Sequence, residues 1–303
     1  MEHVGFHTAS DGTEIWYGTV GQGPAMVLCD GFACDGFIWP YVIDRFHEHF
    51  RIVRFHYRGH GQSSRPVDPG RVAVEDLCGD LRGVLDDLSI EHAIFAGHSM
   101  GVQVILQFYG LYPELVDALI PMCGTYKRPL DTFHDSDRLA TLLPYIDRAV
   151  ELAPEQLQSM WKKLLPSRFS MLASRAELNP RLVRSADFLP YLEHVSRMDL
   201  RVFVRMLSEL ADHTAEDILP TIDIPMLIIA GERDTFTPRY RSEEMEAAVA
   251  SAELLVLPNT THAAPLELPD MVEDAVERFL RAHDLWAGDG DEVRPPAETA
   301  VDP

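Results

Sequence analysis

Residues 93–109 read AIFAGHSMGVQVILQFY and contain Gly97-His98-Ser99-Met100-Gly101, which matches the pattern G-x-S-x-G. The apolar run Ala93–Ala96 before it is typical of a buried strand, and Val102–Tyr109 after it is typical of a helix. A serine at such a strand-to-helix turn stands in strained backbone and exposes its hydroxyl at the edge of a sheet. We therefore predict that Ser99 is a nucleophile.

Strand-like and helix-like segments alternate along most of the chain. Short apolar runs bounded by turn residues predict further strands at Thr13–Val20, Ala25–Cys29, Arg51–His56, Leu119–Met122, Met226–Ala230 and Leu254–Leu257. Apolar residues at helical spacing predict helices at Val74–Leu88 and Met271–Ala282. Continuous apolar strands are typical of parallel sheets buried on both faces. We predict an α/β fold with a mostly parallel central sheet and helices on both faces.

The alternation stops between about Lys127 and Thr221, where the sequence reads as helical only. Leu200, Phe203, Val204 and Leu207 there form an apolar stripe at helical spacing. We predict a helical cap at 127–221, inserted into a core formed by 1–126 and 222–286. The alternative is extra packing helices without a role at the site. An acidic segment at 287–303, poor in apolar residues, is predicted to be disordered.

A serine hydroxyl is a weak nucleophile at neutral pH, so it needs a base and the base needs an orienting acid. In α/β sheets with a G-x-S-x-G turn the chain order is serine, acid, histidine. Asp234 and His262 each follow a predicted strand, at the carboxyl edge where such sheets place their sites. We predict Asp234 as the acid and His262 as the base. Glu232 is a rival for the acid.

An oxyanion formed during acyl transfer needs backbone N–H donors. One is expected from Met100, the residue after the nucleophile, and the second from the loop that follows Ala25–Cys29. Gly31 in this loop permits close backbone approach, so we predict the N–H of Phe32 as the second donor. The alternative is a tight turn without function.

Two further segments carry a resemblance to a known family. Tyr57-Arg58-Gly59-His60-Gly61-Gln62-Ser63-Ser64 is similar to an arginine-glycine loop, and Thr261-His262-Ala263-Ala264-Pro265-Leu266-Glu267-Leu268-Pro269 to a histidine loop. Together with the serine turn, they make the chain resemble the α/β-hydrolase superfamily, in its branch of capped esterases and lactonases. The likeness implies hydrolysis of a small molecule without cofactor or metal.

The sequence departs from this family at two positions. Asp30 stands where the family usually has histidine, and Val102 where it usually has glycine. A carboxylate beside the oxyanion hole would oppose the developing negative charge, so we expect Asp30 to point away, toward a backbone or arginine partner. Epoxide hydrolases and haloalkane dehalogenases of this fold use aspartate at the position of Ser99, so those activities are set aside.

Three functions stay open at this point. The first is hydrolysis of a carboxylic ester or lactone through an acyl-serine. The second is carbon–carbon bond hydrolysis or cofactor-free perhydrolysis on the same three residues, and the third is ligand binding without catalysis. Flexible and aromatic bulk in the insertion favours an apolar acyl group as ligand; it comprises Met160, Trp161, Phe169, Met171, Phe188, Met198, Phe203 and Met206.

Composition indicates which binding partners and which cellular location to expect. The formal net charge is −22, which disfavours nucleic acid and anionic membranes. The four cysteines form no C-x-x-C pair, so neither a metal site nor a disulfide framework is expected. The chain begins without a leader-like segment, and its apolar runs are too short to span a bilayer, so a cytoplasmic location is expected by elimination. The oligomeric state is left open.

Overall fold

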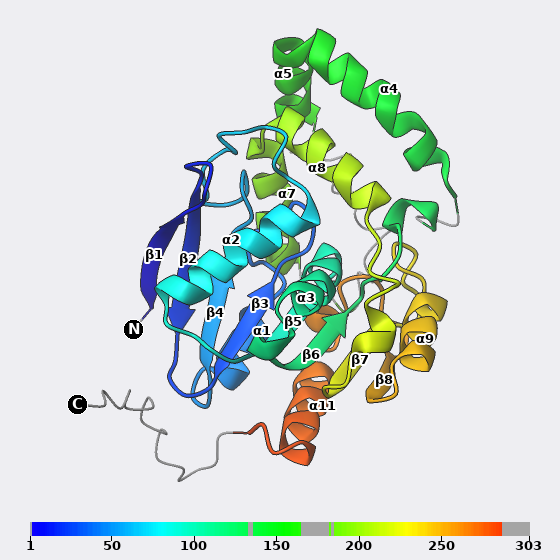
Figure 1. Cartoon of the computed structure of the whole chain (residues 1–303). Helices are drawn as coiled ribbons and strands as arrows, with labels where there is room; N and C mark the ends of the chain where they lie inside the picture. Colours follow the sequence, from blue (N-terminus) through cyan, green and yellow to red (C-terminus); the bar gives the residue numbers. More distant parts are fainter. Residues whose placement is uncertain (1, 133–135, 165–181, 183–184, 287–303) are drawn as a thin grey trace, which may run out of the picture.

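A computed structural model describes residues 2–132, 136–164, 182 and 185–286. Eight strands form one sheet in the order β1-β2-β4-β3-β5-β6-β7-β8 (Figure 1). The β1–β2 and β2–β4 pairs are antiparallel, and the other neighbours are parallel, which confirms the predicted mostly parallel sheet. The strands are β1 (His3–Thr8), β2 (Glu14–Val20), β3 (Ala25–Cys29), β4 (Arg51–Phe55), β5 (Ala93–His98), β6 (Val116–Met122), β7 (Met226–Gly231) and β8 (Ala252–Leu257).

Helices cover both faces of this sheet, as predicted (Figure 1). Along β3, Val27 and Cys29 belong to one buried cluster, whereas Met26 and Leu28 belong to the cluster on the opposite face. This two-sided burial explains why the strand reads as a continuous apolar run. One face is packed by α2 (Val74–Asp87), α3 (Met100–Leu111) and α9 (Arg239–Ala248), and the other by α1 (Pro40–Phe46) and α11 (Pro269–Ala282).

The elements that were not predicted from the sequence include β1, α1 and α9. Strand β1 is an edge strand whose Val4 and Phe6 are largely exposed, so no buried face imposes an alternating pattern on it. Helix α9 buries only Ser242 and Met245, so its apolar periodicity is weak. Strand β6 begins at Val116, three residues before the predicted Leu119. Sequence periodicity therefore finds the buried elements and misses those with few buried side chains.

Helices fill the described part of the insertion between β6 and β7. Leu143 and Val150 pack against Leu200 and Val204 in a small apolar cluster separate from the sheet. Figure 1 shows α4 and α5 standing away from the sheet. The insertion contains α4 (Arg138–Leu152), α5 (Pro154–Leu164), α7 (Ser185–Arg197) and α8 (Leu200–Asp212).

The predicted boundaries of a core and a cap, at 126/127 and 221/222, stay a prediction. The predicted disordered tail at 287–303 lies outside the described residues.

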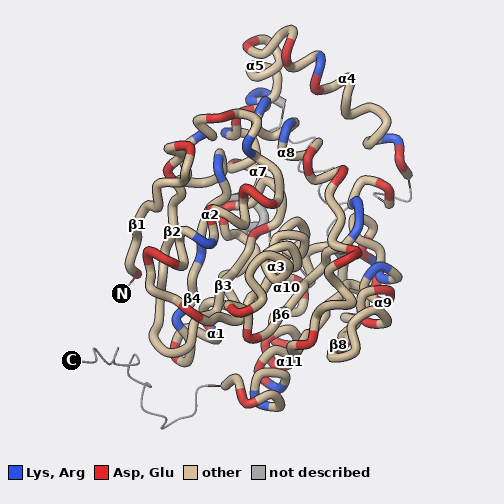
Figure 2. The backbone as a smooth tube through the Cα atoms, viewed as in Figure 1, with Lys and Arg blue, Asp and Glu red and all other residues tan. Residues whose placement is uncertain are grey.

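Charged residues of both signs occur along most of the described elements. Figure 2 shows acidic and basic residues dispersed along the same elements. Several of them form exposed ion pairs one turn apart, such as Arg239 with Glu243 and Arg82 with Asp86. None of the helices described is long and apolar enough to cross a membrane.

A buried ion pair holds the loop after β4 against α2. The guanidinium of Arg58 is fully buried, and its Nε and Nη2 donate to the two carboxylate oxygens of Asp80 at 2.8 and 2.5 Å. Its Nη1 donates to Asp11 at 3.1 Å and to the carbonyl oxygen of Arg71 at 2.8 Å. This bidentate arrangement satisfies charges that would be costly to bury alone.

Replacement of this arginine tests how much the fold depends on it. Arg58→Met leaves the Asp80 carboxylate buried without its partner, so the free energy of unfolding should fall by about 3–5 kcal/mol in urea denaturation. The control Arg239→Met breaks an exposed pair and should lower it by less than about 1 kcal/mol. Equal small losses in both variants would contradict the assigned role of Arg58.

Candidate active site

Ser99 connects β5 to α3 in a backbone conformation that L-residues seldom adopt. Its φ is 55° and its ψ is −116°. The turn is crowded: a Cβ on Gly97 would lie 2.4 Å from the carbonyl oxygen of Gly101, and one on Gly101 would lie 2.2 Å from that of Cys29. Both glycines are therefore required for the close approach of β5, α3 and β3. This is the strained strand-to-helix turn that the G-x-S-x-G pattern predicts.

The structure brings Ser99, His262 and Asp234 into one line of hydrogen bonds. Nε2 of His262 lies 2.8 Å from the Oγ of Ser99, and its Nδ1 lies 2.9 Å from Oδ2 of Asp234. Ser99 and His262 are 163 residues apart in sequence, so only the sheet joins them. The arrangement has the geometry in which a histidine can take a proton from a serine hydroxyl.

Asp234 is buried and held by several donors. Its Oδ1 accepts the backbone N–H groups of Phe236 and Thr237 at 2.8 and 2.9 Å, and its Oδ2 accepts the Thr237 hydroxyl at 2.8 Å. Burial alone would raise the pKa of Asp234, but His262 and the bonds from Thr237 lower it below its ordinary value. These contacts favour the ionised form of Asp234. Thr237 was not predicted, although Asp-Thr-Phe-Thr carries the signal of a local side-chain turn.

The rival acid, Glu232, is engaged elsewhere. Its carboxylate accepts the backbone N–H of Asn259 at 2.7 Å, and the side chain is exposed. The adjacent loop is further fixed by Glu267, which was not predicted as part of the site. It accepts the N–H of Thr261 at 2.5 Å and its hydroxyl at 2.8 Å. These contacts leave Asp234 as the carboxylate that meets His262.

The loop after β3 passes directly beside the nucleophile. A Cβ on Gly31 would lie 3.2 Å from the Cβ of Ser99, so the main chain here comes as close as glycine permits. The N–H of Ala33 donates to Nε2 of His60 at 3.2 Å, so that amide is committed to the loop after β4. Phe32 lies between these two residues, and Met100 is the first residue of α3. Both predicted oxyanion donors are thus on segments that adjoin Ser99.

Val102 replaces the glycine usual in the resembling family, and the structure shows how it is accommodated. Val102 is fully buried. A Cβ on Gly124, after β6, would lie 2.2 Å from Cγ2 of Val102. The space for the larger side chain on α3 is therefore provided by a glycine on the neighbouring segment, and the serine turn keeps its shape.

Of the two kinds of partner expected for Asp30, the structure shows the backbone, at Gly36, and not an arginine, and it adds the side chain of Trp39. The Oδ1 of Asp30 accepts the indole N–H of Trp39 at 2.8 Å. Burial raises the pKa of Asp30 to about 7, against the lowering effects of Trp39, the Arg54 charge and the backbone of Gly36. The arginine acts only through its charge because it is not within hydrogen-bonding distance. A carboxyl of this kind gains a proton more readily than an exposed one.

The apolar bulk expected to line a pocket is divided among several places. Phe203 packs against Phe32 with ring centroids 4.6 Å apart, and Trp161 packs against Phe203 at 4.8 Å. Met198 belongs to the same cluster, whereas Met206 joins the core beneath. Met160 is exposed. The expectations for Phe169, Met171 and the side chain of Phe188 lie outside the described residues.

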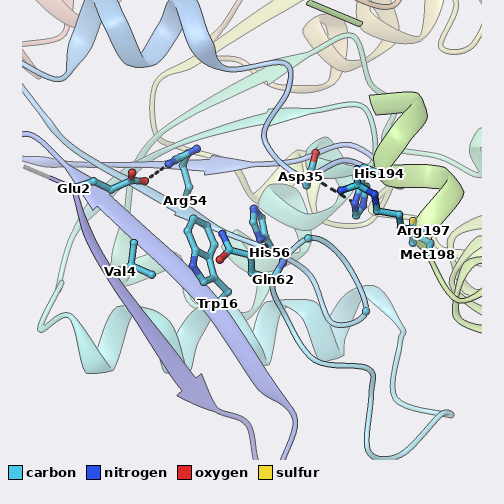
Figure 3. Close-up of a pocket in the computed structure, with 12 residues that line it drawn as sticks. Glu2, Val4, Trp16, Asp35, Arg54, His56, Gln62, His194, Arg197 and Met198 are labelled. Atoms are coloured by element: carbon cyan, nitrogen blue, oxygen red, sulfur yellow. Dashed lines mark hydrogen bonds and ion pairs between the residues drawn. The ribbon is translucent and has the colours of Figure 1, made fainter. Parts of the chain in front are cut away.

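A separate cavity of about 450 Å³ is lined by residues of β1, β2 and β4 and of α7 (Figure 3). Its charged groups are paired: Asp35 faces His194 at 3.5 Å, and Glu2 pairs with Arg54 (Figure 3). None of the three residues joined at Ser99 lines it. Across the described residues, no group of three or more His, Cys, Asp or Glu side chains could hold a metal ion.

The buried Asp30 predicts a change of stability with pH. A carboxyl whose pKa is about 7 when folded, against 3.8 ordinarily, stabilises the fold fully below pH 4 and loses this contribution as pH rises through 7. Asp30→Asn keeps an acceptor for Trp39 without titrating. Relative to the unmodified protein, its free energy of unfolding should therefore rise by about 1.4 kcal/mol per pH unit from pH 5 to pH 7 and level off at higher pH.

Urea denaturation of both proteins at pH 5 and pH 8 measures this difference. Glu155→Gln, which removes an exposed carboxyl, is the control and should not reproduce the pH dependence. A difference between Asp30→Asn and the unmodified protein that stays constant from pH 5 to pH 8 would show that Asp30 does not titrate there.

Comparisons with known proteins agree with this fold. Bifunctional epoxide hydrolase 2 of Mus musculus is 32% identical over 126 residues, which are 41% of this chain and 23% of that protein. A thermophilic esterase from Thermogutta terrifontis matches with a TM-score of 0.74 at 21% identity, over 93% of this chain and 99% of its own. The enol-lactonase from Burkholderia xenovorans LB400 matches with a TM-score of 0.73 at 21% identity, over 91% and 100%.

The match to the mouse protein thus spans less than a quarter of its length, and the two solved structures support the fold alone. A family model described as alpha/beta hydrolase fold matches residues 24–269, which include Ser99, Asp234, His262 and the helical insertion. The chain therefore belongs to the alpha/beta hydrolase fold family.

Proposed function

We propose that the protein hydrolyses a carboxylic ester or lactone through an acyl-serine intermediate on Ser99. The observation that carries this proposal is the 2.8 Å contact between Nε2 of His262 and the Oγ of Ser99, with Asp234 on the other ring nitrogen. Membership of a family of hydrolases supports it. The proposal needs no cofactor, because the three side chains supply nucleophile, base and orienting acid.

In the first half of the reaction, the Oγ of Ser99 attacks the carbonyl carbon while His262 takes the serine proton. The ionised Asp234 stabilises the imidazolium that forms and holds its tautomer. The carbonyl oxygen becomes an oxyanion, for which we assign the N–H groups of Met100 and Phe32 as donors. His262 then gives the proton to the leaving alkoxide oxygen, and the acyl-serine remains.

In the second half, His262 takes a proton from a water molecule, whose oxygen attacks the acyl-serine. The tetrahedral intermediate collapses, Ser99 regains its proton from His262 and the acid leaves. In a lactone the alcohol and the acid are parts of one product, so the same steps open the ring. Two of the structures compared above are named as an esterase and a lactonase, which is consistent with either substrate.

Epoxide hydrolysis is a poorer match, although a relative bears that name. The resemblance that suggests it also implies an aspartate nucleophile, and this chain has serine at that position. A serine would form an alkyl ether with an epoxide, which is not readily hydrolysed, whereas an aspartate forms an ester that water can cleave. Ser99 therefore favours acyl transfer.

We infer an apolar acyl group from the contacts above Phe32. The rings of Phe203 and Trp161 come from α8 and α5 and reach the loop that carries the assigned oxyanion donor. Val195 and Met198 complete this apolar cluster. An acyl chain that left the serine in this direction would be covered by the insertion, so residues 127–221 would act as a cap that excludes water.

A fluorophosphonate probe tests the nucleophile. Because it reacts only with an activated serine, it should label the unmodified protein and leave Ser99→Ala unlabelled, with ester hydrolysis reduced to background. Ser89→Ala is a matched control, since Ser89 also has a positive φ, of 53°, but precedes β5, whereas Ser99 follows the other end of that strand. Labelling of Ser99→Ala with a circular dichroism spectrum like that of the unmodified protein would refute the assignment.

The acyl pocket is tested with p-nitrophenyl acetate, butyrate, hexanoate and octanoate. Each methylene buried against the apolar cluster adds up to about 0.8 kcal/mol, so kcat/KM should rise by as much as about fourfold per methylene. Phe203→Ala should flatten the series. Leu152→Ala, an exposed apolar residue of the same insertion, should leave it unchanged. A series that falls steadily from acetate would exclude an acyl pocket here.

A further inference from the structure

His98 precedes the nucleophile, but its side chain bonds to the loop that carries the base. Its Nε2 lies 2.8 Å from the backbone carbonyl oxygen of His262, and the two imidazole rings are 5.1 Å apart. A carbonyl oxygen can only accept, so Nε2 of His98 carries the proton. The side chain is buried at 3% exposure, where a hydrogen bond is not weakened by competing water.

The other side of the same ring faces the loop after β3. A Cβ on Gly31 would lie 3.1 Å from Nδ1 of His98, so the backbone of this loop passes directly against the ring. The ring of Trp39 meets His98 edge-on, with centroids 6.5 Å apart, and the indole of Trp39 is held by Asp30. The imidazole of His98 therefore lies next to the histidine loop and the loop after β3, and it belongs to the serine turn itself.

We propose that His98 is a positioning residue, which fixes the main chain of His262 so that its ring meets Ser99. This inference rests on the proposed function, because it concerns the base of that reaction. The histidine loop is held on one side by the bonds between Thr261 and Glu267. The bond from His98 holds it on the side of the nucleophile. Displacement of a reacting group by about 1 Å can lower the rate about a hundredfold.

The protonation state of His98 suits this role. Burial, and to a smaller extent the charge of His262, lower the pKa of His98 to about 3, although the bond to the carbonyl of His262 and the charge of Asp234 act in the opposite direction. The ring is therefore neutral over the working range of an esterase. It donates to the carbonyl of His262 throughout, without competing for the serine proton.

Two substitutions separate the donated bond from the volume of the ring. His98→Phe keeps a ring but has no donor, so kcat and the rate of fluorophosphonate labelling should fall by about 10- to 100-fold with KM little changed. His98→Gln places an amide N–H near the position of Nε2 and should recover most of this loss. His56→Phe is the control, because His56 is also a buried histidine and contacts none of the residues joined at Ser99; its labelling rate should stay unchanged.

The outcomes distinguish the two proposals. If the unmodified protein is not labelled at Ser99, the proposed function fails, and the positioning role of His98 fails with it. If it is labelled and His98→Phe reacts equally fast, the positioning role alone is overturned. That role is also overturned if His98→Gln is as slow as His98→Phe while both fold, since a merely structural loss would then explain the effect.

A measurement on the unmodified protein covers the case in which His98→Phe does not fold. Nitrogen-15 NMR of the histidine rings reports which nitrogen carries the proton, and the His98 signal is assigned by its absence from His98→Gln. A neutral ring protonated on Nε2 between pH 5 and pH 8 supports the proposal. Protonation on Nδ1 would overturn it, because the bond to the carbonyl of His262 could not then be donated.

Discussion

Ser99 holds a φ of 55° and a ψ of −116°, a conformation that costs of the order of 1–3 kcal/mol and persists only where the surroundings enforce it. The surroundings here are main chain. Gly97 and Gly101 allow the serine turn to touch β3, and Gly124 leaves room for Val102 beneath it. If any of these contacts were loosened, the hydroxyl would no longer project from the carboxyl edge of the sheet. The rest of the site is built around this turn.

The partners of Ser99 reach it because the neighbouring strands run parallel. In the order β5-β6-β7-β8, the loops after β7 and β8 open at the same edge as the serine turn. They are also bound to each other: the N–H of Arg233 donates to the carbonyl of Thr260 at 2.8 Å, and a Cβ on Gly231 would lie 2.3 Å from that of Thr261. The acid and the base therefore belong to one rigid unit, despite the helical insertion between β6 and β7.

Three buried aspartates, Asp30, Asp80 and Asp234, have different partners in the interior. Asp80 is buried as one half of an ion pair with Arg58, and the pKa of Asp234 is lowered by His262 and by the bonds from Thr237. Asp30 has only neutral donors in contact, so burial dominates and raises its pKa to about 7. The three carboxyls are buried to a similar extent but differ in the charge of the groups that contact them. These contacts decide how easily each carboxyl ionises.

Strands β2 to β8 were predictable because their apolar residues form local patterns in the sequence. The serine turn, Asp234 and His262 were predictable too, because chemistry and strand order restrict where such residues stand. Other features depend on contacts between distant segments. These are the indole that receives Asp30, the commitment of Glu232 to Asn259, the stacking of Phe203 on Phe32 and the bond from His98 to His262. The sequence by itself determined which residues are the candidates for the site, Ser99, Asp234 and His262, through motif and periodicity. Only the tertiary structure decided which neighbours hold them in place, because those neighbours meet through the packing of the sheet, its loops and the inserted helices and leave no local pattern in the chain.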